Sequence, residues 1–255
     1  MKKNILLTML LLMATMAFAA CTGKKSTIQK DAAVQTDTFK TRSGKKIVFT
    51  AIKHGSIRIT FDGREIEVDP VRGLKPTTDY STYPKADYIF VTHEHFDHCD
   101  TAAIRQLEKP TTVIITNANC AKIFGNGTVM HNGDHLRLAD DIQVDAVPAY
   151  NTTPGKEKYH PKGRDNGFIL TLDGFRVYIS GDTEDIPEMR NIKNIDVAFL
   201  STNQPFTMTP EQTARAAKII KPKVLFPYHY SDTPIQKVAD LLKGTGIDVR
   251  IRNYQ

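Results

Sequence analysis

A buried strand that ends in a cluster of metal-binding side chains constrains the fold of this chain more than any other feature. Residues 86–91, ADYIFV, have the apolar, β-branched and aromatic character of a buried strand. The next seven residues, THEHFDH, bring three histidines and two acids to the end of that strand. DTAAIRQLEK follows and has the pattern of a helix, with Asp100 or Thr101 as its cap and Pro110 just beyond its end.

Both halves of the chain alternate hairpins with helix–strand units. Asp62-Gly63 and Asp173-Gly174 lie between alternating apolar and polar runs, which predicts two β-hairpins. Later, Thr209 is a predicted cap, Gln212 completes a capping box, and a strand, a helix and a strand follow over residues 223–253. Hairpins mixed with helix–strand crossovers predict sheets covered by helices, which is a layered α/β fold.

The first twenty residues have the pattern of a secretory signal peptide. Lys2 and Lys3 precede an apolar run, residues 5–20, that is short for a membrane span and ends in small residues. Cys21 then stands where a bacterial lipoprotein carries its lipid, although Phe18 replaces the usual leucine. We expect a lipoprotein anchored on the periplasmic side of the membrane; simple cleavage to a free protein is the alternative.

Residues 21–44 are polar and without a sustained period, which predicts a flexible tether before a domain over residues 45–255. The full chain carries a formal net charge of +6. Removal of Lys2 and Lys3 with the leader lowers it by two, and no basic stripe with interleaved aromatic residues remains. Nucleic acid is therefore not an expected partner.

Cys99 and Cys120 are the cysteines that follow Cys21. One disulfide would be compatible with export, and Cys99 could also neighbour a metal because it follows His98. We expect both to be small buried side chains.

The spacing within THEHFDH suits two metal ions. His93 and His95 lie two residues apart, so in extended backbone their side chains share one face and can reach one ion. Asp97 and His98 follow where the chain turns toward the helix and can face a second ion. Imidazole nitrogen and carboxylate oxygen are ligands that zinc accepts, which favours a metal site. The alternative is a solvated polar loop that binds no metal.

These residues resemble the metallo-β-lactamase superfamily over about residues 47–255. HEHFDH, residues 93–98, matches the His-x-His-x-Asp-His signature of that family. YISGDT matches its strand-end aspartate and PYHY its late histidine, which assigns Asp182 and His229. The resemblance implies a four-layer αββα sandwich of two mixed sheets flanked by helices. It also implies two divalent ions, zinc or else manganese or iron, bridged by Asp182.

One ligand departs from the family pattern. The family places a histidine after the strand that here reads VPAYN, and this chain has Asn151 there. Either His160 reaches in from the following loop, or the first ion keeps only His93 and His95 while Asn151 contacts water or substrate. A neutral amide is a weak zinc ligand, which favours His160.

The segment HGSIRITFDGREIEVDP resembles the branch that contains ascorbate-6-phosphate lactonase and the phospholipase D that cleaves N-acyl phosphatidylethanolamine. A histidine often stands near the pocket there, so His54 is a candidate for substrate binding, with structural packing as the alternative. His131 and His135 lie in a turn and a strand start and are expected at the surface.

The resemblance implies a hydrolase that uses a hydroxide shared by two metal ions, with Asp97 and Asp182 as catalytic residues, and the leader pattern of residues 1–21 adds export. A small ester, lactone, amide or phosphoester is the expected substrate. Basic residues in the loop 151–167 would favour an anionic one, or are simply solvated: Lys156, Lys158, Lys162 and Arg164. The rival hypothesis is a metal-binding envelope lipoprotein without catalysis, a sensor or carrier on the same fold.

Overall fold

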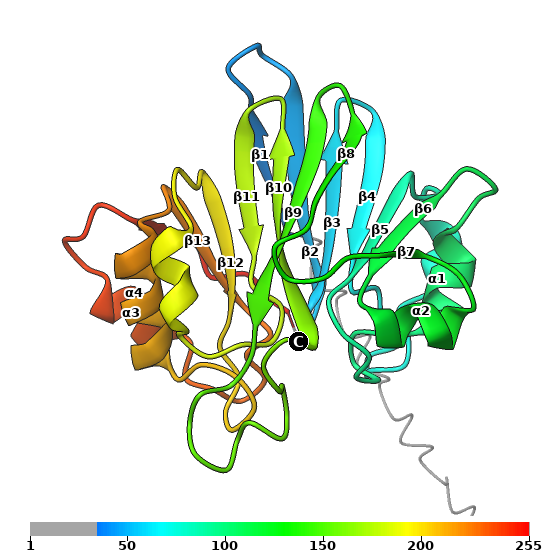
Figure 1. The fold of residues 1–255 in the computed structure, drawn as a ribbon. Helices are drawn as coiled ribbons and strands as arrows, with labels where there is room; N and C mark the ends of the chain where they lie inside the picture. The colour runs from blue at the N-terminus through cyan, green and yellow to red at the C-terminus, as the bar shows by residue number, and fades with distance from the viewer. Residues whose placement is uncertain (1–34, 255) are drawn as a thin grey trace, which may run out of the picture. The chain divides into compact units, whose positions relative to one another are not determined.

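A computed structural model describes residues 35–254, which form two seven-stranded mixed sheets (Figure 1). In the first sheet the strands follow chain order. The four strands β1–β4 pair antiparallel, and β4–β7 pair parallel. The strands are β1 (Gln35–Lys40), β2 (Lys46–Lys53), β3 (Ser56–Phe61), β4 (Arg64–Val68), β5 (Tyr88–Val91), β6 (Val113–Thr116) and β7 (Thr128–Val129).

The second sheet repeats this plan. Its strands β8–β11 pair antiparallel and β11–β14 pair parallel. They are β8 (His135–Ala139), β9 (Ile142–Ala149), β10 (Asp165–Leu172), β11 (Phe175–Ile179), β12 (Val197–Ser201), β13 (Val224–Tyr228) and β14 (Asp248–Val249). Each sheet therefore begins as a hairpin meander and ends as a parallel unit, as the alternation in the sequence predicts.

The main core lies between the two sheets. Aromatic rings from both sheets meet there: Phe49 packs on Phe199 with ring centroids 5.5 Å apart, and Phe90 packs on Phe168 at 5.3 Å. Two further apolar clusters lie on the outer faces, where helices cover the parallel halves of the sheets. The order of helix, sheet, sheet, helix confirms the predicted four-layer sandwich.

Capping residues predicted from the sequence mark the start or the end of the first three α-helices. They are α1 (Thr101–Leu107), α2 (Ala118–Phe124), α3 (Pro210–Ile220), α4 (Gln236–Leu241) and the 3-10 turns η1 (Tyr80–Thr82) and η2 (Pro187–Asn191). The Asp100 carboxylate accepts two backbone N–H bonds at the start of α1, and Thr209 and Gln212 form the expected capping box of α3. Gly125 ends α2 in the left-handed region, with φ 76°.

Several predicted boundaries are corrected. Residues 35–40 were assigned to the tether but form β1, because six residue pairs join them to β2. The last helix and strand are shorter than predicted, ending at Leu241 and Val249. The signal peptide, Cys21 and the tether up to residue 34 lie outside the described residues. Within residues 35–254, no helix combines the length and the apolar character that a membrane crossing requires.

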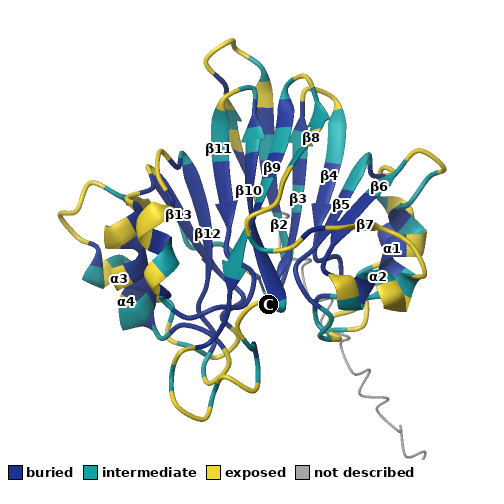
Figure 2. Ribbon diagram, in the orientation of Figure 1, coloured by how far each residue is buried: buried dark blue, intermediate teal, exposed yellow. Residues whose placement is uncertain are grey.

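Loops from both sheets meet at one edge of the sandwich, below the strands in Figure 1. The carboxyl ends of the parallel strands β5, β12 and β13 lie there, because parallel strands end at a common edge. The strands are mostly buried toward this edge, while the loop that follows β9 is mostly exposed (Figure 2). This edge collects the candidate metal ligands.

Candidate metal centre

The predicted ligands come together in two neighbouring clusters. Groups of His, Asp and Glu side chains whose ligand atoms lie within 4.8 Å of one another include His93–His95–His160 and His93–His98–Asp182, and a four-membered group of His54, Asp97, His98 and His229. We call the residues around His93, His95 and His160 the first cluster, and those around Asp97, His98 and His229 the second cluster. Asp182 lies between them.

The first cluster joins the motif loop after β5 to the loop after β9. His93 Nε2 and His95 Nδ1 are 3.0 Å apart, although both residues follow the end of β5 rather than lie within it. His160 Nε2 lies 3.4 Å from Asp182 Oδ2. His93 and His160 are fully buried, whereas His95 is half-buried at the solvent side.

The second cluster joins the motif loop to the end of β13. His98 Nε2 and His229 Nε2 are 3.0 Å apart. Asp97 Oδ2 lies 3.9 Å from His229 Nε2. Two donors bound at about 2.1 Å to one ion are about 3.0–3.4 Å apart when adjacent and at most about 4.2 Å apart when opposite. The His93–His95 separation in the first cluster and these two separations in the second are those of ligands to a common ion.

Asp182 contacts both clusters with one carboxylate. Its Oδ2 lies 3.4 Å from both His160 and His229, and its Oδ1 lies 3.5 Å from His98. Within residues 35–254, two buried atoms of this set have no hydrogen-bond partner, His160 Nε2 and Asp182 Oδ1. Buried polar atoms are normally satisfied, so two unsatisfied ligand atoms in this set fit a cation that would bind them.

Hydrogen bonds behind the rings orient the histidines. His98 Nδ1 donates to Asp69 Oδ2 at 2.8 Å, which leaves Nε2 as the lone-pair atom. The Thr92 hydroxyl donates to the same carboxylate and lies 2.9 Å from His93 Nδ1, so it can accept from that ring. The Asn203 side-chain amide lies 3.2 Å from His229 Nδ1. These contacts turn the Nε2 atoms toward the clusters.

His160 and Asn151, the two alternatives for the missing ligand, contact one another. His160 Nδ1 donates to Asn151 Oδ1 at 2.7 Å, and Asn151 Nδ2 donates to the backbone oxygen of Phe206 at 2.7 Å. Both residues are buried. His160 is therefore the ring that completes the first cluster. Asn151 supports it, because its amide oxygen accepts from His160 and its amide nitrogen donates to the backbone; its predicted contact with substrate stays a prediction.

Mutual electrostatics keep the carboxylates of the centre ionised. Burial would raise the pKa of Asp182, but His229 and His98 hold it well below its usual value. Burial would likewise lower the pKa of His98, yet Asp182 and Asp69 raise it well above its usual value. Burial lowers the pKa of His229 to about 3. An ionised Asp182 beside a neutral His229 offers donors that a divalent cation prefers.

The remaining histidines, cysteines and loop cations singled out in the sequence lie outside the two clusters. His131 and His135 are exposed and face Asp134 and Asp145, as expected of surface residues. Cys99 is half-buried, Cys120 is buried, and both are free thiols. Of the loop cations, Lys162 pairs with Glu188, and Arg164 pairs with Asp165 and Glu94. The charge that this loop could offer to an anion is therefore partly neutralised within the protein.

The supporting residues were not found from the sequence. Asp69 and Asn203 lie in loops far from the motif along the chain, and no spacing links them to it. The usable signal is positional: each follows a buried strand that ends at the same edge as the ligands, β4 and β12 respectively.

The family model of the β-lactamase superfamily domain matches residues 48–229, which span all the ligands of both clusters. The chain belongs to the metallo-β-lactamase superfamily. It is a metal-dependent hydrolase of that superfamily, which sets aside the non-catalytic alternative.

Relatives of similar length support this assignment. A UPF0173 metal-dependent hydrolase of Ligilactobacillus salivarius is 32% identical over 192 residues, covering 71% of this chain and 84% of the relative. A crystal structure assigned as a metal-dependent hydrolase from Parabacteroides distasonis shares 56% identity with a TM-score of 0.84, covering 87% of this chain and all of the other. Igni18, a metallo hydrolase of Ignicoccus hospitalis, shares 25% identity with a TM-score of 0.68, covering 81% and 95%.

Proposed function

We propose that this protein is an exported hydrolase with a dinuclear metal centre that acts on a small ester, lactone, amide or phosphoester. The observation that carries the dinuclear centre is the position of Asp182, whose Oδ2 lies 3.4 Å from a histidine of each cluster. One carboxylate shared in this way is the arrangement of centres that hold two ions about 3.5–4 Å apart.

The residues divide into two ligand sets. His93, His95 and His160 would hold the first ion, Asp97, His98 and His229 would hold the second, and Asp182 would be shared between them. Bound there, divalent ions would supply Lewis-acid chemistry: a lower pKa for coordinated water and charge to stabilise a developing oxyanion. Zinc suits the nitrogen-rich donors of the first set, while manganese or iron also accepts imidazole and carboxylate ligands.

The residues of this chain contribute charge and orientation. Asp97 and Asp182 place negative charge beside the ions, and Asp69 and Asn151 fix the rings that face them. Because the ions supply the polarising charge, the reaction requires no serine or cysteine nucleophile. A centre of this kind suits esters, lactones, amides and phosphoesters alike, because negative charge develops on a substrate oxygen in the hydrolysis of each.

Export is a separate part of the proposal and is supported by the sequence of residues 1–21 alone. Expression of the full chain in a bacterial host should yield a membrane-associated protein whose N-terminus is a lipid-modified Cys21. Cys21→Ser should release the protein from the membrane fraction. Retention of the leader on a cytoplasmic protein would contradict this part and leave the hydrolase assignment intact.

Activity is tested with a panel of neutral and anionic esters, lactones, amides and phosphoesters. We expect hydrolysis of at least one class by the metal-loaded protein and its loss in Asp182→Ala and in His95→Ala. His135→Ala, which removes an exposed histidine far along the chain from the ligands, is the matched control. Full activity in a protein carrying both Asp182→Ala and His95→Ala would contradict the proposed centre.

A further inference from the structure

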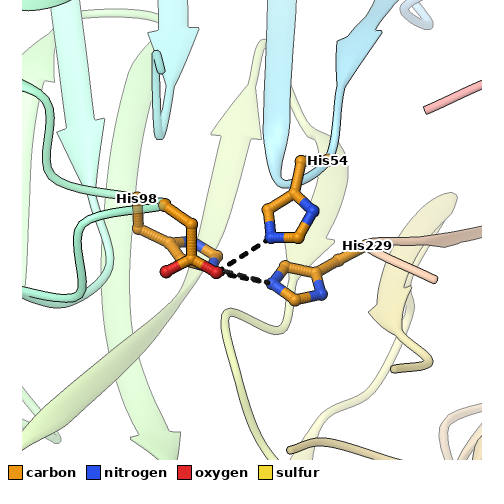
Figure 3. Close-up of side chains that lie close together, drawn as sticks. His54, His98 and His229 are labelled. Atoms are coloured by element: carbon orange, nitrogen blue, oxygen red, sulfur yellow. Dashed lines mark hydrogen bonds and ion pairs between the residues drawn. The ribbon is translucent and has the colours of Figure 1, made fainter. Parts of the chain in front are cut away.

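His54 projects from the turn between β2 and β3 into the second cluster (Figure 3). Its Nε2 lies 3.0 Å from Asp97 Oδ2. Its ring centroid is 3.7 Å from that of His229 and 5.9 Å from that of His98. We infer that His54 is a ligand of the second ion, in addition to Asp97, His98 and His229. This inference rests on the proposed dinuclear centre and adds one residue to it.

The spacing of the four ligand atoms supports a shared ion. All four ligand atoms gather within 4.8 Å of one another, and Asp97 Oδ2 lies 3.9 Å from His229 Nε2, inside the limit of about 4.2 Å for opposite donors. The 3.0 Å between His54 and Asp97 equals the 3.0 Å between His98 and His229. Adjacent donors around one ion are expected about 3.0–3.4 Å apart. Asp182 also lies beside this group, with Oδ1 3.5 Å from His98 Nε2 and Oδ2 3.4 Å from His229 Nε2.

The backbone holds His54 in a conformation that would otherwise be unfavourable. Its φ is 47°, in the left-handed region that non-glycine residues rarely adopt. The His54 N–H donates to the Tyr254 carbonyl oxygen, and the His54 carbonyl accepts from the His229 N–H at 3.1 Å. The second bond fastens the turn directly to another proposed ligand. Such an over-determined, strained residue is typical of a functional site.

Gly55 lets this turn approach the cluster. A Cβ at position 55 would lie 2.8 Å from His98 Cε1 and 3.1 Å from His98 Nδ1, which is closer than real Cβ contacts. The absence of a side chain therefore allows the turn to press against the His98 ring.

The competing role is a hydrogen bond to Asp97 alone, in which His54 positions the carboxylate without touching the ion. Replacement by glutamine separates the two roles. The amide of His54→Gln can donate to Asp97 as the ring does, but a neutral amide is a weak metal ligand. His54→Ala removes both roles, and His135→Ala is the histidine control.

The experiment titrates the metal-free full-length protein with Co²⁺, follows the visible absorption of each equivalent, and measures both affinities by competition with a chelator. We expect His54→Ala and His54→Gln to weaken the second ion about 100-fold or more and to change its spectrum, because loss of supporting residues alone costs about 10–100-fold. The first ion should bind with unchanged affinity and spectrum, and His135→Ala should match the wild type.

Two results would overturn the inference while leaving the proposed function in place. A second ion that binds His54→Gln with the wild-type affinity and spectrum would reduce His54 to a positioning residue for Asp97. Unchanged binding to His54→Ala would remove any role at the ion. A wild-type protein that takes up no second ion would contradict both the inference and the dinuclear centre.

Discussion

The two clusters share Asp182 but are supported differently. In the first, His160 comes from the mostly exposed loop after β9 and is oriented by a neutral amide, that of Asn151. In the second, His98 is oriented by the buried carboxylate of Asp69, and a further carboxylate, Asp97, lies among the ligands. The second cluster therefore carries more negative charge close to its ion.

This difference has an expected consequence. A carboxylate behind a histidine raises the basicity of the ring, and a carboxylate among the ligands adds direct attraction. We expect the second cluster to bind its ion more tightly, and the first cluster to hold the ion that exchanges more readily. The motif loop serves both clusters, but the first takes His160 from the loop after β9 and the second takes His229 from the residue after β13.

The largest effect should come from removing the residue that both clusters share. Asp182→Ala takes one donor from each ion and should lower the affinity for both by more than about 100-fold, since even supporting residues cost about 10–100-fold. Hydrolysis should be lost with the ions. Metal content after dialysis is the measurement, and Asp240→Ala, an exposed acid on α4, is the control. Retention of both ions by Asp182→Ala would break the idea of a shared ligand.

A side chain at position 55 should disturb the second cluster alone. In Gly55→Ala the new Cβ must displace the His98 ring, which it would otherwise approach to 2.8 Å. Misplacement by about 1 Å costs on the order of 100-fold in rate, so a smaller shift should cost about tenfold. Gly73→Ala is the matched control, because no atom lies within 4 Å of a Cβ there. Steady-state kinetics and the affinity for the second ion are the readouts, and equal effects of the two variants would contradict the crowding.

Each cluster has one asparagine that contacts one of its histidines, so the two clusters can be tested by equivalent substitutions. Asn151→Ala should weaken the first ion about 10–100-fold and leave the second unchanged, because only His160 loses its partner. Asn203→Ala should weaken the second ion, with a smaller effect because Asp69 still holds His98. The separate affinities are measured by competition with a chelator. The comparison would be wrong if both variants weakened the same ion.

A buried carboxyl group outside both clusters lacks, in the part of the chain that the structure describes, the histidine neighbours that keep Asp182 ionised. Glu67 lies on β4, two residues before Asp69, and is fully buried without a hydrogen-bond partner among residues 35–254. Burial raises its pKa from 4.5 to about 8. The folded protein thus keeps a proton that the unfolded chain loses above pH 4.5, so this contribution to stability is complete below pH 4.5 and is lost as the pH rises through 8.

The stability of the wild type should consequently fall relative to Glu67→Gln as the pH rises. The expected slope is about 1.4 kcal/mol per pH unit between pH 5 and 8, because the amide has no proton to lose. Urea unfolding across this range measures it, with Glu157→Gln at an exposed position as the control. Parallel pH profiles of the wild type and Glu67→Gln would show that Glu67 is ionised in the folded state.

Much of the architecture could be predicted because it depends on local patterns. The Asp-Gly turns, the Thr209 capping box and the apolar strands appear where the sequence places them. The motif ligands could be assigned for the same reason, since His93 to His98 are adjacent in the chain. The start of the domain was misplaced because β1 is short and polar, and its strand conformation depends on pairing with β2.

The roles of Asn151, Asp69 and His54 could not be derived in this way, because each depends on contacts between distant segments. Asn151 meets His160 only after the loop following β9 folds back, and Asp69 meets His98 only when β4 and β5 pair. His54 reaches the second cluster because its turn is bonded to the backbone of His229. Sequence spacing carries no record of these contacts.

The central claim is that two ions share Asp182, and metal content tests it most directly. The full-length protein, purified without a histidine tag and reconstituted with zinc or manganese, should contain two ions per chain by mass spectrometry after removal of the excess. If the protein held one ion or none after reconstitution with zinc and also after reconstitution with manganese, the dinuclear centre would be contradicted.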